Sequence, residues 1–275
     1  MRRAWIAIAA AVGLTASPAV AAPGAEPRGV PEAPQERFDT VVIDAGHGGD
    51  DEGALGPRGN SEKKLVLGVA RRLREVLRDQ GLRVVMTRED DRFVPLETRT
   101  AIANDARGDL FISIHANATR DPDIRGRETF FLSLDATDEA AQRVAARENA
   151  AFGGKGAAGA AAADPLIELL GDMIANLHSR ESSELAHAVQ DKLALIDPAR
   201  SRGVKQAPFV VLMGLQMPAT LAEIGFITNR ADERDLQSEG GRGGIVSALA
   251  NAVLEFGRRF DARRGVDARV PAKAR

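Results

Sequence analysis

Two histidines stand where apolar runs end, and this shared setting is the first sign of chemistry in the sequence. His47 lies a few residues after the run 38–43, and His115 directly follows the run 110–114. In open α/β sheets, ligands bind outside the carboxyl ends of the strands, so two histidines at strand ends can converge on one point. The alternative is two unrelated histidines in loops or in the core. The matched settings favour a shared site.

Glu62 places a carboxylate on the inward face of a predicted helix. It lies three residues before Leu65 and four before Val66, which begin a set of apolar residues spaced by three and four up to Leu77. A buried carboxylate is costly unless it is paired or binds a metal. The alternative is that Glu62 stabilises the helix dipole from the first turn. This would explain the position of Glu62 in the sequence, but not why its side chain points inward. Two imidazoles and one carboxylate are the protein ligands of many catalytic zinc sites, which leave a fourth position for water.

Glu223 is a second candidate carboxylate and lies within the otherwise apolar run 220–227. A lone buried glutamate needs a partner. One alternative is a water molecule at the metal, from which Glu223 would accept a proton during amide hydrolysis. The other is an ion pair with an arginine such as Arg99. We favour the first alternative, which makes Glu223 the catalytic residue.

The composition limits the chemistry that this chain can perform. Its 275 residues include no cysteine, so a metal site must use histidine and carboxylates. The hydrophobic share of 44% and the charged share of 28% are ordinary for a soluble globular protein. A net charge of -2 gives no reason to expect nucleic acid as a partner, because nucleic acids favour a concentrated basic patch.

Residues 1–21 have the pattern of a signal peptide. Arg2 and Arg3 precede an apolar run at 4–16, and the small-x-small pattern of a cleavage site follows at 19–21. The apolar run is shorter than the roughly 20 residues that a membrane-spanning helix needs, which argues against the alternative of an uncleaved anchor. We therefore expect a secreted, periplasmic protein with no stable membrane span after processing.

Strands and helices alternate along the rest of the chain. Short apolar or β-rich runs predict strands at 38–43, 82–86, 110–114, 129–132, 209–212 and 220–224. Apolar residues spaced by three and four predict helices that include 62–80, 98–104 and 245–256. This alternation predicts an α/β domain with a largely buried sheet. We place a flexible linker at 22–37, the catalytic domain at 38–262 and a C-terminal tail at 263–275.

Residues 135–180 interrupt this alternation and are predicted to form an insertion. They begin with a charged helix at 137–148, continue with a tract made almost only of Ala and Gly at 151–163, and end with a second amphipathic helix near 165–177. The Ala/Gly tract is low in complexity, and we expect it to let the first helix move.

Four motifs, in order along the chain, resemble those of the zinc-dependent N-acetylmuramoyl-L-alanine amidases, the family typified by the bacterial cell-division amidases. The resemblance covers about residues 38–260. The first motif is residues 41–49, with the sequence VVIDAGHGG, and the second is Glu62 within 61–63. The third comprises Thr87, Arg88, Leu96, Arg99, Ala103 and Asn104, followed by residues 109–117 with the sequence DLFISIHAN. The fourth is the block 218–229.

The resemblance implies a fold, a cofactor and a reaction. The fold is a three-layer α/β/α domain with a twisted mixed sheet of about six strands and an inserted helical regulatory segment. One Zn²⁺ is held by His47, Glu62 and His115, and Glu223 is catalytic. The substrate is peptidoglycan, in which the enzyme cleaves the amide between the lactyl group of N-acetylmuramic acid and the L-alanine of the stem peptide.

The resemblance also gives the insertion a role. Similar division amidases carry a helix at this place that covers the active site, with a glutamate near the zinc, and an activator protein displaces it. Glu148 is therefore our candidate autoinhibitory ligand, and an activator that acts on the inserted helix is an expected partner. A solvated glutamate such as Glu139 is the alternative interpretation of Glu148, and the sequence leaves both open.

Other residues near the motifs have less specific expected roles. Asp44 could support the metal ligands from behind, Arg99 could brace the sheet edge, and Asn117 could orient His115 or contact substrate. The acidic run 50–52 is interpreted as a solvated loop. Another zinc hydrolase, such as a peptidoglycan peptidase or a sugar deacetylase, is the alternative function, because the ligand set does not by itself select the muramoyl amide. A non-catalytic wall-binding module would predict a degraded ligand set.

Overall fold

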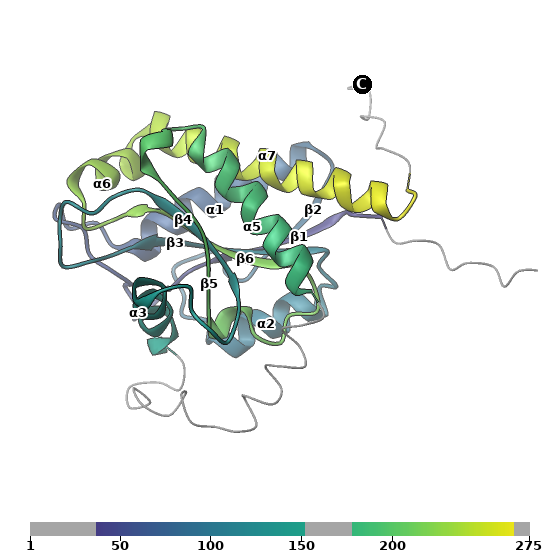
Figure 1. The fold of residues 1–275 in the computed structure, drawn as a ribbon, viewed down its shortest axis with the longest axis horizontal. Helices are drawn as coiled ribbons and strands as arrows, with labels where there is room; N and C mark the ends of the chain where they lie inside the picture. Colours follow the sequence, from purple (N-terminus) through teal and green to yellow (C-terminus); the bar gives the residue numbers. More distant parts are fainter. Residues whose placement is uncertain (1–36, 152–177, 267–275) are drawn as a thin grey trace, which may run out of the picture. The chain divides into compact units, whose positions relative to one another are not determined.

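A six-stranded mixed sheet forms the centre of the structure, a computed structural model that describes residues 37–151 and 178–266 (Figure 1). The strand order is β2-β1-β3-β6-β4-β5. Only β4 and β6 pair antiparallel, and every other neighbouring pair is parallel. The strands are β1 Thr40–Ala45, β2 Arg83–Met86, β3 Leu110–Asn117, β4 Arg127–Leu132, β5 Ser201–Ala207 and β6 Ala219–Phe226.

Helices cover both faces of this sheet, because successive side chains of a strand point to opposite faces and both sets are apolar. One face packs against the apolar sides of α1 (Glu62–Asp79), α5 (Ser179–Ala194) and α7 (Glu239–Arg263). The other face packs against α2 (Leu96–Asp105), α3 (Glu139–Glu148) and the 3-10 turn η3 (Val210–Leu212). The predicted three-layer α/β/α fold with a mixed sheet of six strands is confirmed.

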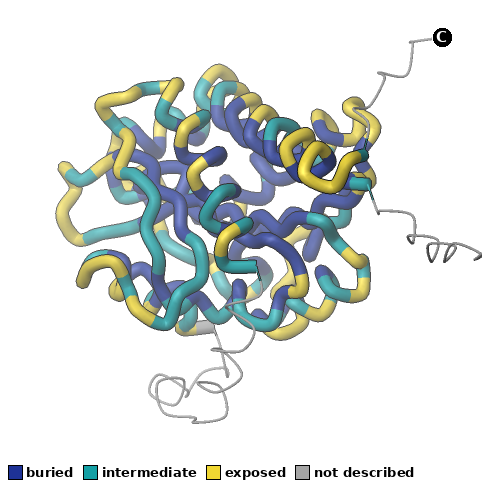
Figure 2. The backbone as a smooth tube through the Cα atoms, turned by 45° about the vertical axis from the view of Figure 1, so that its right-hand side comes forward, coloured by how far each residue is buried: buried dark blue, intermediate teal, exposed yellow. Residues whose placement is uncertain are grey.

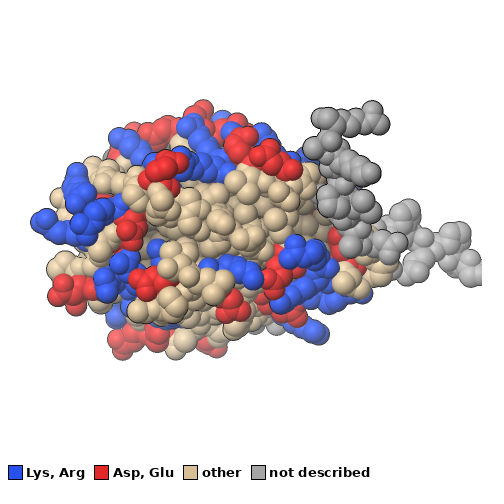
Figure 3. Space-filling view, turned by 90° about the horizontal axis from the view of Figure 1, so that it is seen from above, with Lys and Arg blue, Asp and Glu red and all other residues tan. Residues whose placement is uncertain are grey.

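Burial follows the layers, since the buried positions concentrate in the strands and on the inward sides of the helices (Figure 2). A short helix, α6 (Arg230–Gln237), follows β6 and packs against α7. On the face seen in Figure 3, acidic and basic side chains are interspersed, so this face presents no basic patch of the kind that nucleic acid favours. Among the described residues, no helix combines the length and apolarity that crossing a membrane requires.

One predicted strand is wrong, and one strand escaped prediction. Residues 209–212 form η3, and their apolar character reflects the burial of Val211 and Leu212 rather than strand pairing. The true strand is β5, whose sequence is SRGVKQA and whose side chains are mostly half-buried or exposed. Because β5 lies at the edge of the sheet, it lacks the apolar run that marks an interior strand.

Several predicted segments lie outside the described residues. These are the signal peptide at 1–21, nearly all of the linker at 22–37, and the second amphipathic helix near 165–177, with almost all of the Ala/Gly tract. The last helix is longer than expected, since α7 begins at Glu239 rather than near 245. The first turns of α7 contain four glycines between 240 and 244. Because glycine is a poor helix former, the sequence pattern did not predict a helix there.

Parallel pairing brings two distant segments of the chain to the same edge of the sheet. In the register of β1 with β3, Ala45 pairs with Ile114. The chain that follows stays close, since the backbone N–H of Gly46 donates to the carbonyl of Ile114 at 3.1 Å. His47, just after β1, and His115, near the end of β3, therefore lie side by side at the carboxyl edge of the sheet. This edge is where α/β sheets bind ligands.

Candidate metal centre

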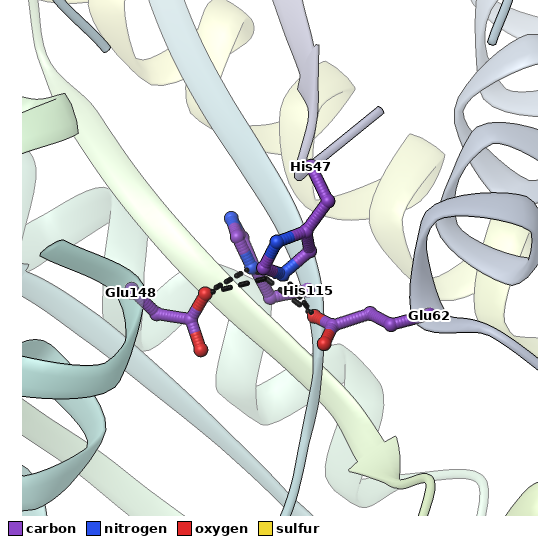
Figure 4. A group of neighbouring side chains, drawn as sticks. All are labelled: His47, Glu62, His115 and Glu148. Atoms are coloured by element: carbon purple, nitrogen blue, oxygen red, sulfur yellow. Dashed lines mark hydrogen bonds and ion pairs between the residues drawn. The ribbon is translucent and has the colours of Figure 1, made fainter. Parts of the chain in front are cut away.

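Two histidines and two glutamates converge at this edge of the sheet (Figure 4). His47, Glu62, His115 and Glu148 each offer one ligand atom, and these atoms all lie within 4.8 Å of one another. Nε2 of His47 is 3.1 Å from Oε1 of Glu62 and 3.3 Å from Oε2 of Glu148. Nδ1 of His115 is 3.2 Å and 2.8 Å from the same two oxygens. Three sequence-predicted metal ligands and the predicted autoinhibitory glutamate thus meet at one point.

The loop between β1 and α1 places His47 and Glu62. His47 has a φ of 60°, a backbone conformation uncommon for a residue with a side chain, and the guanidinium of Arg99 donates to its carbonyl at 2.9 Å. Glu62 is the first residue of α1 and is fully buried. Its Oε1 accepts from the backbone of Ala116 at 2.9 Å, and its Oε2 from the backbone of Ala54 at 3.0 Å. These bonds aim the carboxylate across the gap towards β3.

Gly46 makes room for the ring of His115. A β carbon at position 46 would lie 2.3 Å from Cε1 and 2.5 Å from Nε2 of that ring. Any side chain there would force the imidazole out of its position, since carbon atoms in van der Waals contact are about 3.5–4.0 Å apart. The glycine that ends the first strand is therefore a requirement of the site.

The donor atoms fit a bound metal ion. Nε2 of His47 and Oε2 of Glu148 are buried, and within the described residues neither has a hydrogen-bond partner of suitable geometry. Buried polar atoms without partners are rare and call for an explanation. Four ligands at about 2.0–2.2 Å from a zinc ion, at the corners of a tetrahedron, lie about 3.3–3.6 Å apart. The four nitrogen–oxygen distances, from 2.8 to 3.3 Å, come close to this spacing.

The electrostatics of the site favour a cation. Burial alone would lower the pKa of His115, but the carboxylates of Glu148 and Glu62 outweigh it and raise that pKa to about 10. Burial likewise opposes the charge of His47, yet Glu62, Asp51 and Glu148 raise its pKa well above the ordinary value. Without a metal, the two imidazoles hold protons that balance the glutamates. A divalent ion supplies the same two charges and displaces those protons.

Glu223 lies beside this cluster on β6. In the register of β3 with β6, Glu223 pairs with His115, and both side chains are on the α3 face of the sheet. The carboxylate is fully buried, and its Oε2 has no hydrogen-bond partner among the described residues. Burial, together with the charge of Glu148, raises its pKa well above the ordinary value against the opposing charge of Arg147. A buried carboxyl with a raised pKa next to a metal-binding cluster is suited to proton transfer.

Asp44, Arg99 and Asn117, which were expected to support the site, make contacts that differ in part from their expected roles. Asp44 accepts from Arg99 at 2.7 Å, from Thr87 at 2.6 Å and from Ser113 at 2.6 Å, and so supports the strand ends rather than a ligand side chain. Arg99 is held by Asp44, so it is not the arginine that contacts Glu223; that contact comes from Arg147, whose Nη2 lies 3.4 Å from Oε1 of Glu223.

Asn117 contacts Glu128 and Arg147, which lie beside Glu223, instead of orienting a candidate metal ligand. Its Nδ2 donates to Glu128 at 2.6 Å, and its Oδ1 accepts from Arg147 at 3.0 Å. No hydrogen bond joins it to His115 in the described part of the chain. The role of orienting that histidine, which the sequence suggested, has no support in these contacts.

Two residues at the site escaped sequence reasoning. Oδ2 of Asp51 lies 2.9 Å from Nδ1 of His47, although the acidic run containing it was interpreted as a solvated loop. Arg147 contacts Oε1 of Glu148 at 2.6 Å and Oε1 of Glu223 at 3.4 Å. No local pattern pointed to Asp51, because residues 46–51 form a loop, in which spacing does not show which side chains meet. For Arg147, the only signal was its place next to Glu148.

A buried group that can hold a metal ion, beside a buried carboxylate at the carboxyl edge of an α/β sheet, is the arrangement of metal-dependent hydrolases. The comparisons with known proteins agree. The chain belongs to the Amidase_3 family, described as N-acetylmuramoyl-L-alanine amidase, whose model matches residues 41–255. It is a peptidoglycan hydrolase that cleaves the amide between N-acetylmuramic acid and L-alanine.

Named relatives and solved structures place the chain within this family. It is 37% identical to N-acetylmuramoyl-L-alanine amidase AmiA of Escherichia coli strain K12 over 225 residues, which covers 80% of this chain and 77% of the relative. It is 38% identical to AmiC of E. coli O6:H1 over 75% of this chain, and this match spans half of that relative's length. The fold matches AmiC2 of Nostoc punctiforme with a TM-score of 0.60, at 28% identity over 81% of this chain and 98% of the other. It also matches the amidase of Clostridium difficile 630 with a TM-score of 0.62, at 27% identity over 80% and 97% of the two chains.

Proposed function

We propose that the amidase works with a single zinc ion held by His47, Glu62 and His115. The convergence of their ligand atoms is the observation that carries this proposal, together with Nε2 of His47 and Oε2 of Glu148, two buried atoms that have no hydrogen bond of suitable geometry within the described residues. Two imidazoles and a carboxylate are a ligand set of catalytic zinc. When bound, zinc lowers the pKa of water and polarises a carbonyl group.

In this proposal, Glu223 moves the proton. Its carboxylate accepts a proton from the attacking water and returns it to the amine that leaves with L-alanine. Support comes from its pairing with His115 in the sheet, which places the carboxylate beside the proposed metal ligands. The hydrogen bonds of Glu62 to the backbone of Ala116 and Ala54 hold that ligand in place without its taking part in proton transfer.

We further propose that α3 holds the enzyme in a resting state. Glu148, the last residue of α3, brings Oε2 to within 2.8 Å of the ligand nitrogen of His115 and 3.3 Å of that of His47. A fourth protein ligand closes the position that a catalytic zinc site keeps for water and substrate. An activator that draws α3 away would reopen it. The solvated alternative does not fit Glu148, whose side chain is 3% exposed, whereas that of Glu139 on the same helix is 95% exposed.

We place the enzyme in the periplasm. The signal-peptide pattern of residues 1–21 supports export, and the substrate lies outside the cytoplasmic membrane. Fractionation of cells producing the tagged protein tests this localisation, and recovery of full-length, unprocessed protein in the cytoplasm would contradict it.

One experiment tests the zinc chemistry and the cleaved bond together. The purified chain, without residues 1–21, is analysed for bound metal and is incubated with peptidoglycan, and the released fragments are identified by mass. We expect one zinc per chain and release of whole stem peptides from sugar strands that keep the lactyl group. A peptidase would release peptide pieces, and a deacetylase would release acetate. His115→Ala serves as the control, and activity at the wild-type rate after chelation would exclude the zinc proposal.

A further inference from the structure

Two cations lie two strands away from Glu223, on the same face of the sheet. Arg202 and Lys205 belong to β5, and β4 runs between β5 and β6 (Figure 1). Glu128 of β4 pairs with Glu223 in the antiparallel register of β4 and β6. The Oε2 of Glu128 is 3.2 Å from Nε of Arg202 and 3.3 Å from Nζ of Lys205. A row of charged groups thus leads from the catalytic carboxylate to the edge of the sheet.

The two cations of this row contact one acid from the sheet and one from α3. The first acid is Glu128, whose Oε2 contacts both Arg202 and Lys205. The second acid is Asp138, the N-cap residue of α3. Its Oδ2 lies 3.1 Å from Nζ of Lys205, and its Oδ1 accepts from the backbone of Ala141 at 2.7 Å. Displacement of α3 would remove Asp138 and leave Arg202 and Lys205 to share the single carboxylate of Glu128.

The position of these cations suits a peptide carboxylate. Two strand spacings of about 4.8 Å separate β5 from β6, so the cations lie about 10 Å from Glu223. An extended peptide covers that distance in about three residues. Arg202 is fixed over the ring of Phe226 at 5.2 Å, and its side chain is 32% exposed, so it is both ordered and accessible. An acid carried within the first residues of the stem peptide would reach this pair.

We propose that Arg202 and Lys205 form a subsite for a carboxylate of the stem peptide, and that Asp138 occupies this subsite in the resting protein. The inference rests on the proposed displacement of α3. In this proposal, α3 blocks both the metal site and the carboxylate subsite. Glu148 closes the metal site, while Asp138 takes the place of a carboxylate of the substrate. Both carboxylates leave with the same helix.

The test compares two soluble muramyl peptides, one with free carboxylates and one with the same carboxylates amidated. The ratio of their kcat/KM values measures carboxylate recognition. The fraction of enzyme in which α3 is displaced affects both substrates equally and cancels in this ratio. We expect Lys205→Gln to lower the ratio about tenfold, the size of one hydrogen bond to a charged group, mainly through KM. Lys205→Arg should retain the ratio, since it keeps the charge.

Matched variants separate this inference from a structural role and from the proposed resting state. Lys192→Gln removes a lysine that pairs with Glu255 on the opposite face of the sheet and should leave the ratio unchanged. Asp138→Asn should raise both rates together, because it weakens the hold on α3. If Lys205→Gln and Arg202→Gln lower the two rates equally, the pair only braces the sheet and the subsite is refuted. If instead the ratio falls while Asp138→Asn changes neither rate, the carboxylate subsite stands and its occupation by Asp138 in the resting protein is refuted.

Discussion

The carboxylate of Asp51 and the imidazole of His47 lie 2.9 Å apart, and this contact fixes the ring of a proposed metal ligand from behind. The second oxygen of Asp51 accepts from the backbone N–H of Gly53 at 3.0 Å, so the carboxylate is itself held in place. A carboxylate on the far nitrogen of a ligating histidine sets which nitrogen is free to bind the metal and makes the ring more basic.

Asp51→Ala should therefore weaken zinc binding by about 10- to 100-fold, the usual cost of losing such a partner. Asp51→Asn keeps an acceptor for the ring N–H and should lose less. Competition with a chromogenic chelator measures the affinity. Asp50→Ala, which removes an exposed acid next to it, is the control and should bind zinc as the wild type does. Equal affinities for Asp51→Ala and Asp50→Ala would contradict this role.

Glu223→Gln should retain zinc and lose most of its turnover. The amide keeps the size of the side chain but cannot accept the proton of the attacking water, and general-base catalysis contributes about 100- to 10,000-fold. Metal content by mass spectrometry and the rate of stem-peptide release measure the two properties on one sample. A variant with bound zinc and a near-normal rate would remove Glu223 from the mechanism.

Glu148→Ala should raise the basal rate about tenfold or more, because α3 loses its hold on the metal ligands. Arg147→Ala should raise it further in the double variant, since Arg147 also joins α3 to Asn117 and to Glu223, the proposed catalytic residue. Glu139→Ala is the matched control on the same helix and should leave the rate unchanged, because its side chain is exposed. A basal rate that stays at the wild-type level in Glu148→Ala would show that α3 does not restrain the enzyme.

Asp44→Asn should destabilise the fold in a manner that depends on pH. Burial alone would raise the pKa of Asp44, but Arg99 and the hydroxyls of Ser113 and Thr87 outweigh it and hold the pKa below its ordinary value of 3.8. Such a group stabilises the fold above pH 3.8 and loses this contribution as the pH falls through the folded-state pKa. The variant leaves Arg99 as a buried charge without its acid, which costs about 3–5 kcal/mol near neutral pH.

Urea unfolding of the wild type and Asp44→Asn between pH 7 and pH 3 measures this dependence. The difference in the free energy of unfolding should be largest above pH 3.8 and should shrink below it, where the unfolded chain and then the folded protein take up the proton of Asp44. A difference that stays constant across this range would show that the charge of Asp44 does not pair with Arg99.

Much of the candidate metal centre could be predicted from the sequence, because local patterns within single strands and helices indicated where its residues lie. The apolar runs before His47 and His115 indicated strand ends, and parallel strands share an edge. The helical spacing of Leu65 and Val66 showed that Glu62 points inward. These inferences used only the residues within one strand or one helical turn, and the alternation of such elements predicted an α/β domain. The three layers and the mixed sheet were what the resemblance to the amidase family implied.

The rest of the site and the strand β5 depend on contacts between elements far apart in the sequence, which no local pattern predicts. The pairing of Lys205 with Glu128 and Asp138 joins two strands and a helix, and β5 itself was hidden by its polar edge sequence. The position of Arg147 between Glu148 and Glu223 depends on how α3 lies across the sheet. The sequence left Glu148 balanced between a solvated residue and a ligand for the same reason.

The tight fit of Gly46 against the ring of His115 bears on how proteins of this kind could change over evolutionary time. Exchange of this one glycine for alanine would add a methyl group where the imidazole now lies, while the layers around it would keep their packing. The product would be a folded domain in which the imidazole of His115 can no longer join the other three residues of the candidate metal centre. A single base change therefore separates a complete site from a broken one within the same fold.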